Sequence, residues 1–287
     1  MMINGNITVA DALRYGVSVL SENKTIETPR LDAEVLLCYV LKCERIALII
    51  NKDRLMSKTE HQLYVSYLSR RQKNEPVSYI TGAKEFMSLN FEVCEGILVP
   101  RPDTEILVEE IIEIYKDREA TIVDLCTGSG AIAVSLAHYL KKSKIIAVDK
   151  YDVCIDCAKR NAMNSDVNIK VIKADVLDDF KLNENIDCIV SNPPYIETEV
   201  LAGLSDDVKN YEPQYALDGG ADGLIFYRKI TEYASRTLNK GGILAYEIGY
   251  NQSETVTQII TDTGAFCNVE TVKDLAGLDR VILAEKR

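Results

Sequence analysis

Residues 191–197 of this 287-residue chain, SNPPYIE, could hold the amino group of a planar molecule. They follow an apolar run that is typical of a buried strand, and a proline ends a strand because it has no N–H for the ladder. The side-chain oxygen of Asn192 and the carbonyl of Pro193 accept hydrogen bonds, while neither Pro193 nor Pro194 offers a backbone donor. Tyr195 adds a flat ring for stacking. The stretch predicts a pocket for an –NH₂ group; a proline-capped strand end with a surface tyrosine is the alternative.

A glycine loop within residues 123–133, VDLCTGSGAIA, is the second group that could do chemistry. Strand-like residues lead into Gly128, Ser129 and Gly130, and a helical run follows. This order places backbone N–H groups and the positive end of a helix at a strand tip. The loop lacks the Lys and Ser or Thr of a P-loop and matches G-x-G-x-x-G only in part. By itself it predicts a ligand loop no better than a tight strand-to-helix turn.

Acidic residues end three successive strand-like runs, at Asp124, Asp149 and Asp175. Asp149 stands about 20 residues after Gly128, where a doubly wound fold presents a carboxylate to the ribose hydroxyls of a nucleoside. Asp175 could reach an adenine amino group from the same edge. Because Asp124 and Asp149 would repel a pyrophosphate, a nucleoside ligand fits better than a phosphate. A solvated aspartate at the strand end is the alternative reading of Asp149.

Alternating runs from about residue 120 onward predict how these residues are brought together. Strand-like runs lie at 120–126, 144–149, 168–175, 186–191, 241–249 and 280–286, and helical runs at 130–142, 151–164, 222–239 and 252–263. Such alternation predicts parallel strands covered by helices, with ligands at the carboxyl ends of the strands. The connection 192–221 is roughly thirty residues long, whereas such loops usually have about 2–6, and this length indicates a functional loop.

A different pattern precedes this region. Residues up to about 84 show apolar positions at helical spacing, and residues 86–99, FMSLNFEVCEGILV, read as two short strands around CEG. We therefore predict a helical N-terminal domain over 1–84, a hairpin linker over 85–100 and a second domain over 101–287.

Composition narrows the function classes. The 33 basic and 44 acidic residues give a net charge of −11, which argues against a protein that binds by neutralising many phosphates. We expect no nucleic-acid partner. No apolar run approaches the about 20 residues that span a bilayer, and the first residues lack the pattern of a signal peptide. The eight cysteines are scattered, several in apolar runs, and there are two histidines. These observations predict a cytoplasmic protein without a metal or a membrane partner.

In their order and spacing, DLCTGSG, AVD and SNPPY resemble the class I methyltransferases that transfer a methyl group from S-adenosylmethionine to nitrogen. Further segments, including PRPDTE and YEPQYALDGGADGL, narrow the resemblance to the HemK/PrmC family, which methylates the glutamine of the GGQ motif in peptide chain release factors. It extends from residue 29 to the C-terminus. Cys126 departs from the family pattern, which more often has glycine there, and Leu278 stands where many relatives carry a basic residue.

The resemblance implies a Rossmann-like α/β fold with a mostly parallel seven-stranded sheet, a small N-terminal helical bundle that recognises the substrate, and a connecting β-hairpin. It also implies the activity: transfer of a methyl group from S-adenosyl-L-methionine to the side-chain nitrogen, N5, of the GGQ glutamine in class I release factors, in support of translation termination. S-adenosyl-L-homocysteine is then the second product. We expect the enzyme to act as a monomer.

The site residues follow from the motifs together with the resemblance. Asn192 and the Pro193 carbonyl are expected to accept hydrogen bonds from the two amide hydrogens and so to favour the charge that the nitrogen gains during attack, while Tyr195 packs on the amide plane. The expected cofactor-binding residues are Cys126, Thr127, Gly128, Ser129, Gly130, Asp149, Asp175 and Asn192. The expected substrate-binding residues are Asn192, Pro193, Pro194, Tyr195, Arg101, Asp103 and Thr104.

Two other functions fit parts of the pattern. A methyltransferase acting on the exocyclic amine of a nucleic acid, at adenine N6 or guanine N2, would receive a flipped base in NPPY. A non-enzymatic adaptor would bind the cofactor at the glycine loop without transferring a methyl group.

Overall fold

The computed structural model describes residues 7–178 and 180–287, and these form two compact units. The first unit comprises the described residues up to 82 together with residues 205–211, and the second comprises residues 83–204 and 212–287. Residues 1–6, which we assigned to the N-terminal domain, lie outside the described residues. The helices of the first unit are α1 (Val9–Ser21), α2 (Pro29–Leu41), α3 (Arg45–Ile50), α4 (Lys58–Arg71), α5 (Val77–Thr81) and α9 (Asp206–Tyr211).

The helices of the first unit begin where their capping residues stand. The side chains of Thr8 and Ser57 each accept a hydrogen bond from the N–H of the third helical residue. That residue, Asp11 or Glu60, accepts a bond from the N–H of the capping residue through its own side chain. The unit has its own apolar core, in which Tyr64 and Leu68 are fully or almost fully buried. An ion pair of 2.7 Å joins Arg71 to Asp32 within this core. The unit therefore has an interior separate from that of the second unit.

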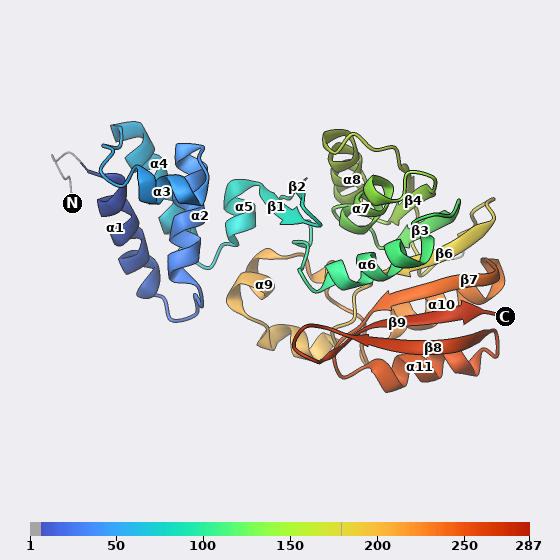
Figure 1. Cartoon of the computed structure of the whole chain (residues 1–287). Coiled ribbons are helices and arrows are strands. Elements are labelled where there is room, and N and C mark those ends of the chain that lie inside the picture. The colour runs from blue at the N-terminus through green and yellow to red at the C-terminus, as the bar shows by residue number, and fades with distance from the viewer. Residues whose placement is uncertain (1–6, 179) are drawn as a thin grey trace. The chain divides into compact units, whose positions relative to one another are not determined.

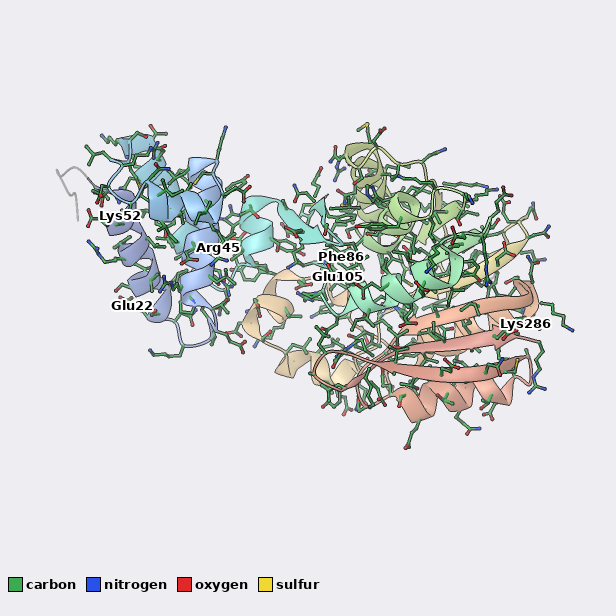
Figure 2. All side chains as sticks on the ribbon, in the orientation of Figure 1. Glu22, Arg45, Lys52, Phe86, Glu105 and Lys286 are labelled. Carbon is green, nitrogen blue, oxygen red and sulfur yellow. The ribbon has the colours of Figure 1, made fainter. Side chains whose placement is uncertain are left out.

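The second unit begins with a hairpin of β1 (Ala83–Phe86) and β2 (Leu89–Glu92). Its turn lies at Met87 and Ser88, and our placement of the turn at CEG was wrong. Both turn residues have positive φ, 50° and 58°, as a two-residue hairpin loop requires, but they are not the asparagine and glycine that usually reveal such a turn. Glu105 lies outside the hairpin and accepts a hydrogen bond from the Met87 N–H at 2.7 Å. Figure 2 labels Glu105 near Phe86, which is a residue of the hairpin.

Seven strands form the sheet of this unit, in the order β5-β4-β3-β6-β7-β9-β8 (Figure 1). They are β3 (Thr121–Leu125), β4 (Lys144–Asp149), β5 (Lys170–Lys173), β6 (Ile186–Ser191), β7 (Leu238–Glu247), β8 (Phe266–Lys273) and β9 (Asp279–Lys286). The first five strands in that order run parallel, and β9 pairs antiparallel with both β7 and β8. The expected fold class is confirmed. Strand β8 was not among the predicted runs, because its mostly exposed or partly buried residues do not form the continuous apolar run that marks the central strands.

Helices cover both faces of the sheet. Along β6, Cys188 points into one core with α6 (Thr104–Tyr115), α7 (Ala131–Tyr139) and α8 (Asp152–Asn164). Its neighbour Ile189 points into the other core with α10 (Ile225–Thr237) and α11 (Ser253–Asp262). Burial on both faces explains why the central strands are continuous apolar runs.

The connection between β6 and α10 contains η1 (Thr198–Gly203), α9 and η2 (Gln214–Ala216). Its middle part, residues 205–211, belongs to the first unit, although we assigned it to the methyltransferase domain. The connection is long because it contributes to both units. In the described part of the chain, no helix is both long and apolar enough to cross a membrane.

Candidate active site

A cavity of about 350 Å³ lies in the second unit, against the carboxyl ends of the central strands. Its wall includes these predicted site residues: Arg101, Thr104, Cys126, Thr127, Gly128, Ser129, Asp149, Asp175, Asn192 and Pro194. Among the described residues, the predicted Asp103, Gly130, Pro193 and Tyr195 do not line it. Apolar side chains, including Leu98, Ile132 and Phe226, form much of the remaining wall.

The glycine loop joins the ends of β3 and β4. The Gly128 N–H donates to the Asp149 carboxylate at 2.9 Å, and the Thr127 N–H donates to the Val148 carbonyl at 3.1 Å. Gly130 has φ of 80°, and a Cβ there would lie 2.9 Å from the Cβ of Ala158. Gly130 is thus needed for the close approach of α8, although it does not line the cavity.

Asp124 lies beneath the loop and is fully buried. Its carboxylate accepts hydrogen bonds from the Thr127 hydroxyl, at 2.5 Å, and from the Ala133 N–H, at 3.2 Å. Burial raises its pKa to about 7, and these hydrogen bonds only partly oppose the effect. Asp124 therefore stabilises the conformation of the loop. It does not line the cavity, whereas Asp149 and Asp175 do.

Asp149 and Asp175 do reach the cavity. Asp149 also accepts a hydrogen bond of 3.0 Å from the Tyr151 N–H, and burial raises its pKa despite these backbone bonds. Burial alone would raise the pKa of Asp175 as well, but its ion pair of 2.8 Å with Lys150 and a bond from the Leu177 N–H bring it below the ordinary value. The carboxylates of Asp149 and Asp175 are thus hydrogen-bond acceptors that differ in pKa and in exposure.

Two aromatic residues of the cavity wall were missed by the sequence reasoning. Tyr151 and Tyr215 stack with ring centroids 3.8 Å apart and planes 27° apart. Tyr151 stands two residues after Asp149, the carboxylate that we expected to bind a ribose, and this position was a usable signal. Tyr215 comes from the long connection, and its hydroxyl donates to the Gly96 carbonyl. Only the folded chain brings Tyr215 to this place.

Asn192 points its amide group at α6. Its Nδ2 donates to the Thr104 hydroxyl oxygen at 3.2 Å, which leaves the amide oxygen for a ligand. Pro194 shares the cavity wall with Asn192, whereas Pro193 does not line the cavity; both prolines are buried. The Tyr195 hydroxyl turns toward β7 and donates to the Glu247 carboxylate at 3.4 Å.

The long connection holds the segment after NPPY by backbone contacts. The Ile196 N–H donates to the Leu217 carbonyl at 2.9 Å, and the Gly219 N–H donates to the Ile196 carbonyl at 2.8 Å. A Cβ on Gly219 would lie 2.7 Å from the Tyr195 Cα. Close packing against the Tyr195 backbone thus explains Gly219 and also Gly223, where a Cβ would lie against the Tyr195 carbonyl oxygen.

The residues of PRPDTE have separate partners. Arg101 lines the cavity and forms an ion pair of 2.5 Å with the buried Glu212 of the long connection. Asp103 lies outside the cavity wall and pairs with Arg280 at 3.4 Å. Thr104 donates to the Glu247 carboxylate at 2.5 Å. Each residue therefore links α6 to a different element, and Arg101 and Thr104 also reach the cavity.

The cavity suits a nucleoside with a less polar extension. It combines backbone amides, the carboxylates of Asp149 and Asp175 and an aromatic pair with apolar walls, and its volume is within the range of small-molecule sites. Among residues 7–178 and 180–287, no cluster of three or more His, Cys, Asp or Glu side chains is placed to hold a metal ion.

A seven-stranded sheet of this order, with a glycine loop, a carboxylate after the second strand and NPPY after the fourth, defines a class I methyltransferase. Residues 11–82 match the model of the PrmC N-terminal domain, and residues 102–204 match that of the methyltransferase small domain. The chain belongs to the release factor glutamine methyltransferase family.

Relatives with that name align over almost the whole chain. The protein from Clostridium acetobutylicum is 42% identical over 280 residues, which are 96% of this chain and 98% of the relative. That from Thermodesulfovibrio yellowstonii is 39% identical, over 89% of this chain and 92% of the relative. That from Bacillus cereus is 36% identical, over 96% of this chain and 99% of the relative. The resemblance expected from the motifs is confirmed.

Solved structures support the fold. A methyltransferase from Pyrococcus furiosus matches with a TM-score of 0.53 and 17% identity, over 77% of this chain and 98% of its own. The 16S rRNA N2 G1207 methyltransferase of Thermus thermophilus, solved with AdoMet and guanosine, matches with a TM-score of 0.51 and 18% identity, over 71% of this chain and 50% of its own.

Proposed function

We propose that this protein transfers a methyl group from S-adenosyl-L-methionine to the side-chain amide nitrogen of the glutamine in the GGQ motif of class I release factors. Family membership over nearly the full length supports the reaction and the substrate class. The glycine loop, Asp149, Asp175 and the stacked tyrosines would hold the nucleoside part of the cofactor. The cofactor supplies an electrophilic methyl group and leaves as S-adenosyl-L-homocysteine.

The observation that carries the mechanism is the orientation of Asn192. Its amide NH₂ is bound to Thr104, so its oxygen remains to accept a hydrogen bond from the substrate amide. An amide nitrogen is a weak nucleophile, and acceptors that fix its hydrogens favour the positive charge that develops as the N–C bond forms. The methyl–sulfur bond of the cofactor would break as the N–C bond forms, and the nitrogen would then release one proton to water. The Pro193 carbonyl is the second proposed acceptor.

The remaining substrate residues surround this position. Pro194 would exclude competing donors, and Arg101 and Thr104 would border the glutamine from α6 and the segment before it. Tyr195 would present its ring to the amide plane, because its hydroxyl is anchored on Glu247. Asp103 does not line the cavity and would act indirectly, through its ion pair with Arg280.

We also infer that the enzyme acts as a monomer in the cytoplasm, without a metal. Its proposed substrate takes part in translation, which supports the cytoplasmic location. The N-terminal unit, whose residues match the PrmC N-terminal domain, would recognise the release factor.

The proposal is tested with labelled S-adenosylmethionine and three acceptors: a class I release factor, the same factor with its GGQ glutamine replaced, and nucleic acid. Label in the first acceptor alone is expected. Label in nucleic acid without label in the release factor would support an exocyclic-amine methyltransferase, and absence of transfer to every acceptor would support an adaptor.

Asn192→Ala tests the acceptor role in the same assay. We expect kcat to fall by about 100-fold or more, while cofactor affinity changes little, because the lost interaction acts on the substrate nitrogen. Asn183→Ala is the control, since Asn183 is an exposed asparagine of the same unit. Wild-type turnover by Asn192→Ala would refute the acceptor role.

A further inference from the structure

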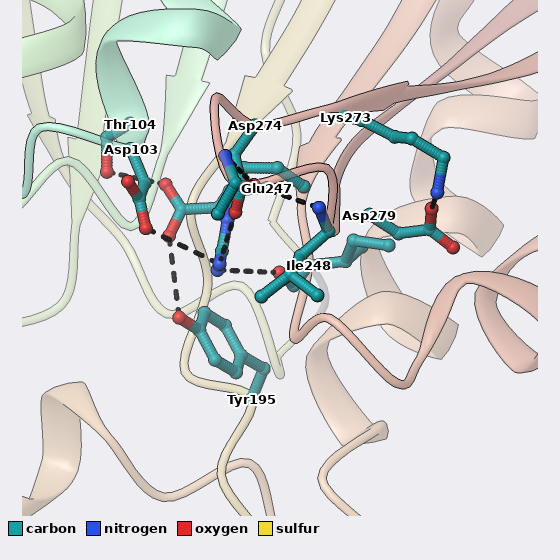
Figure 3. A network of polar contacts seen from close by, with 11 residues as sticks. Asp103, Thr104, Tyr195, Glu247, Ile248, Lys273, Asp274 and Asp279 are labelled. Carbon is teal, nitrogen blue, oxygen red and sulfur yellow. Dashed lines mark hydrogen bonds and ion pairs between the residues drawn. The ribbon is translucent and has the colours of Figure 1, made fainter.

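Glu247, at the end of β7, is a buried acidic residue that the proposed mechanism does not yet use. Its side chain accepts a hydrogen bond from Thr104 through one carboxylate oxygen and from Tyr195 through the other, as Figure 3 shows. Its backbone carbonyl accepts a bond of 3.0 Å from the Tyr227 hydroxyl. The residue is 2% exposed. It therefore contacts Tyr195 after the two prolines of NPPY directly, and it reaches Asn192 before them through Thr104.

The direction of these bonds determines how Asn192 is turned. An ionised carboxylate can only accept hydrogen bonds, so the single hydroxyl hydrogen of Thr104 is donated to Glu247. The Thr104 oxygen can then only accept, and its partner is the Nδ2 of Asn192 at 3.2 Å. With its NH₂ group held there, Asn192 has its oxygen left for the substrate.

The charged and titratable groups around Glu247 come from four elements. Arg280 of β9 and Asp103 before α6 face it with opposite charges, and Tyr195 and Tyr227 approach from the NPPY segment and α10. Arg280 itself forms an ion pair of 3.1 Å with Asp274 and donates to the Ile248 carbonyl at 3.3 Å. Burial raises the pKa of Glu247 to about 7, while Thr104 and Arg280 act against the rise.

We propose that Glu247 is a positioning residue whose carboxylate, through Thr104, determines which end of the Asn192 amide faces the acceptor glutamine. The inference rests on the proposed role of Asn192. It gives Glu247 no contact with the substrate. Its second bond, to Tyr195, orients the ring that would pack on the glutamine amide.

Protonation of Glu247 has a defined consequence. A protonated carboxyl can donate to Thr104, whose hydroxyl can then donate to Asn192, and this reversal turns the Asn192 NH₂ group toward the substrate NH₂. Two donors would then face each other. The ionised form is therefore the active one, and kcat should rise as the pH rises through the pKa of Glu247. The KM for the cofactor should stay almost constant.

Glu247→Gln tests the inference, because it keeps the shape and removes the titration. We expect kcat to fall about 10- to 100-fold and the rise of kcat between about pH 6 and 8 to disappear. Thr104→Val should cause a similar fall. The double variant should be no worse than either single variant, because both break one relay. Glu254→Gln, on the exposed side of α11, is the control and should keep the wild-type profile.

The outcomes separate this inference from the function on which it rests. A wild-type kcat and pH profile in Glu247→Gln, with activity lost in Asn192→Ala, would overturn the role of Glu247 alone. Additive losses in Glu247→Gln and Thr104→Val would also overturn it, since independent structural damage adds. Full activity in Asn192→Ala would instead remove the proposed role of Asn192. Equal cofactor affinity in all variants verifies that each one is folded.

Discussion

At the scale of single residues, Cys126 is the position where the chain departs from a simple glycine loop. It lines the cavity and has φ of 62°, in the left-handed region that favours glycine. A residue with a Cβ is disfavoured in that conformation by about 1–2 kcal/mol. The family pattern, which more often has glycine here, thus has a backbone reason, and Cys126 is tolerated because its side chain is small.

Cys126→Gly should therefore stabilise the protein, by up to about 1 kcal/mol, because relief of backbone strain exceeds the extra entropy of glycine in the unfolded chain. Cys126→Val should lose about 1–2 kcal/mol, since a β-branched side chain suits this φ still less. Denaturant unfolding of both variants beside the wild type measures the difference. Equal stability of the glycine and valine variants would contradict this account.

At the scale of elements, the long connection acts as a support for NPPY. Its two ends belong to the second unit, and residues 217–220 pair with the backbone around Ile196. Gln252, at the start of α11, donates to the Tyr195 carbonyl at 3.0 Å from the other direction. The functional loop expected from its length is thus also a structural one, which holds the strand-end motif.

Gly219→Ala should displace this support. The new Cβ would lie 2.7 Å from the Tyr195 Cα and 2.8 Å from the Gly223 carbonyl oxygen, and both are backbone atoms that cannot turn aside. We expect kcat to fall by at least about tenfold, with a smaller change in cofactor affinity. Gly203→Ala is the matched control from the same connection, because nothing lies within 4 Å of its Cβ position. Equal activity of the two variants would show that the contact is unimportant.

At the scale of the whole molecule, the two units have separate cores. The ion pair of Asp32 and Arg71 is almost completely buried in the first unit, whereas every residue of the cavity wall belongs to the second. Removal of one member of a buried pair leaves the other charge without compensation. Damage at this pair should therefore remain in the unit that contains it.

Asp32→Ala should destabilise the first unit by about 3–5 kcal/mol. Binding of S-adenosylmethionine should change less than about twofold, since the pair and the cavity belong to different units and share no partner residues. Calorimetric unfolding with and without cofactor measures both effects, and the cofactor should raise the unfolding temperature of the second unit. Asp53→Ala, at an exposed aspartate of the first unit, is the control. Loss of cofactor binding in Asp32→Ala would show that the units are coupled.

The sequence by itself determined six of the seven strands, the glycine loop, Asp149 and NPPY, because apolar runs, loop glycines and strand-end residues are local signals of a parallel sheet. Only the tertiary structure decided the rest. Tyr215 and Glu212 reach the site from a connection whose path no local pattern reveals. Glu247 lies within the predicted strand-like run 241–249, yet its bonds to Thr104 and Tyr195 span 143 and 52 residues of chain. Such contacts depend on which strands become neighbours, and that choice is made by packing of the whole unit.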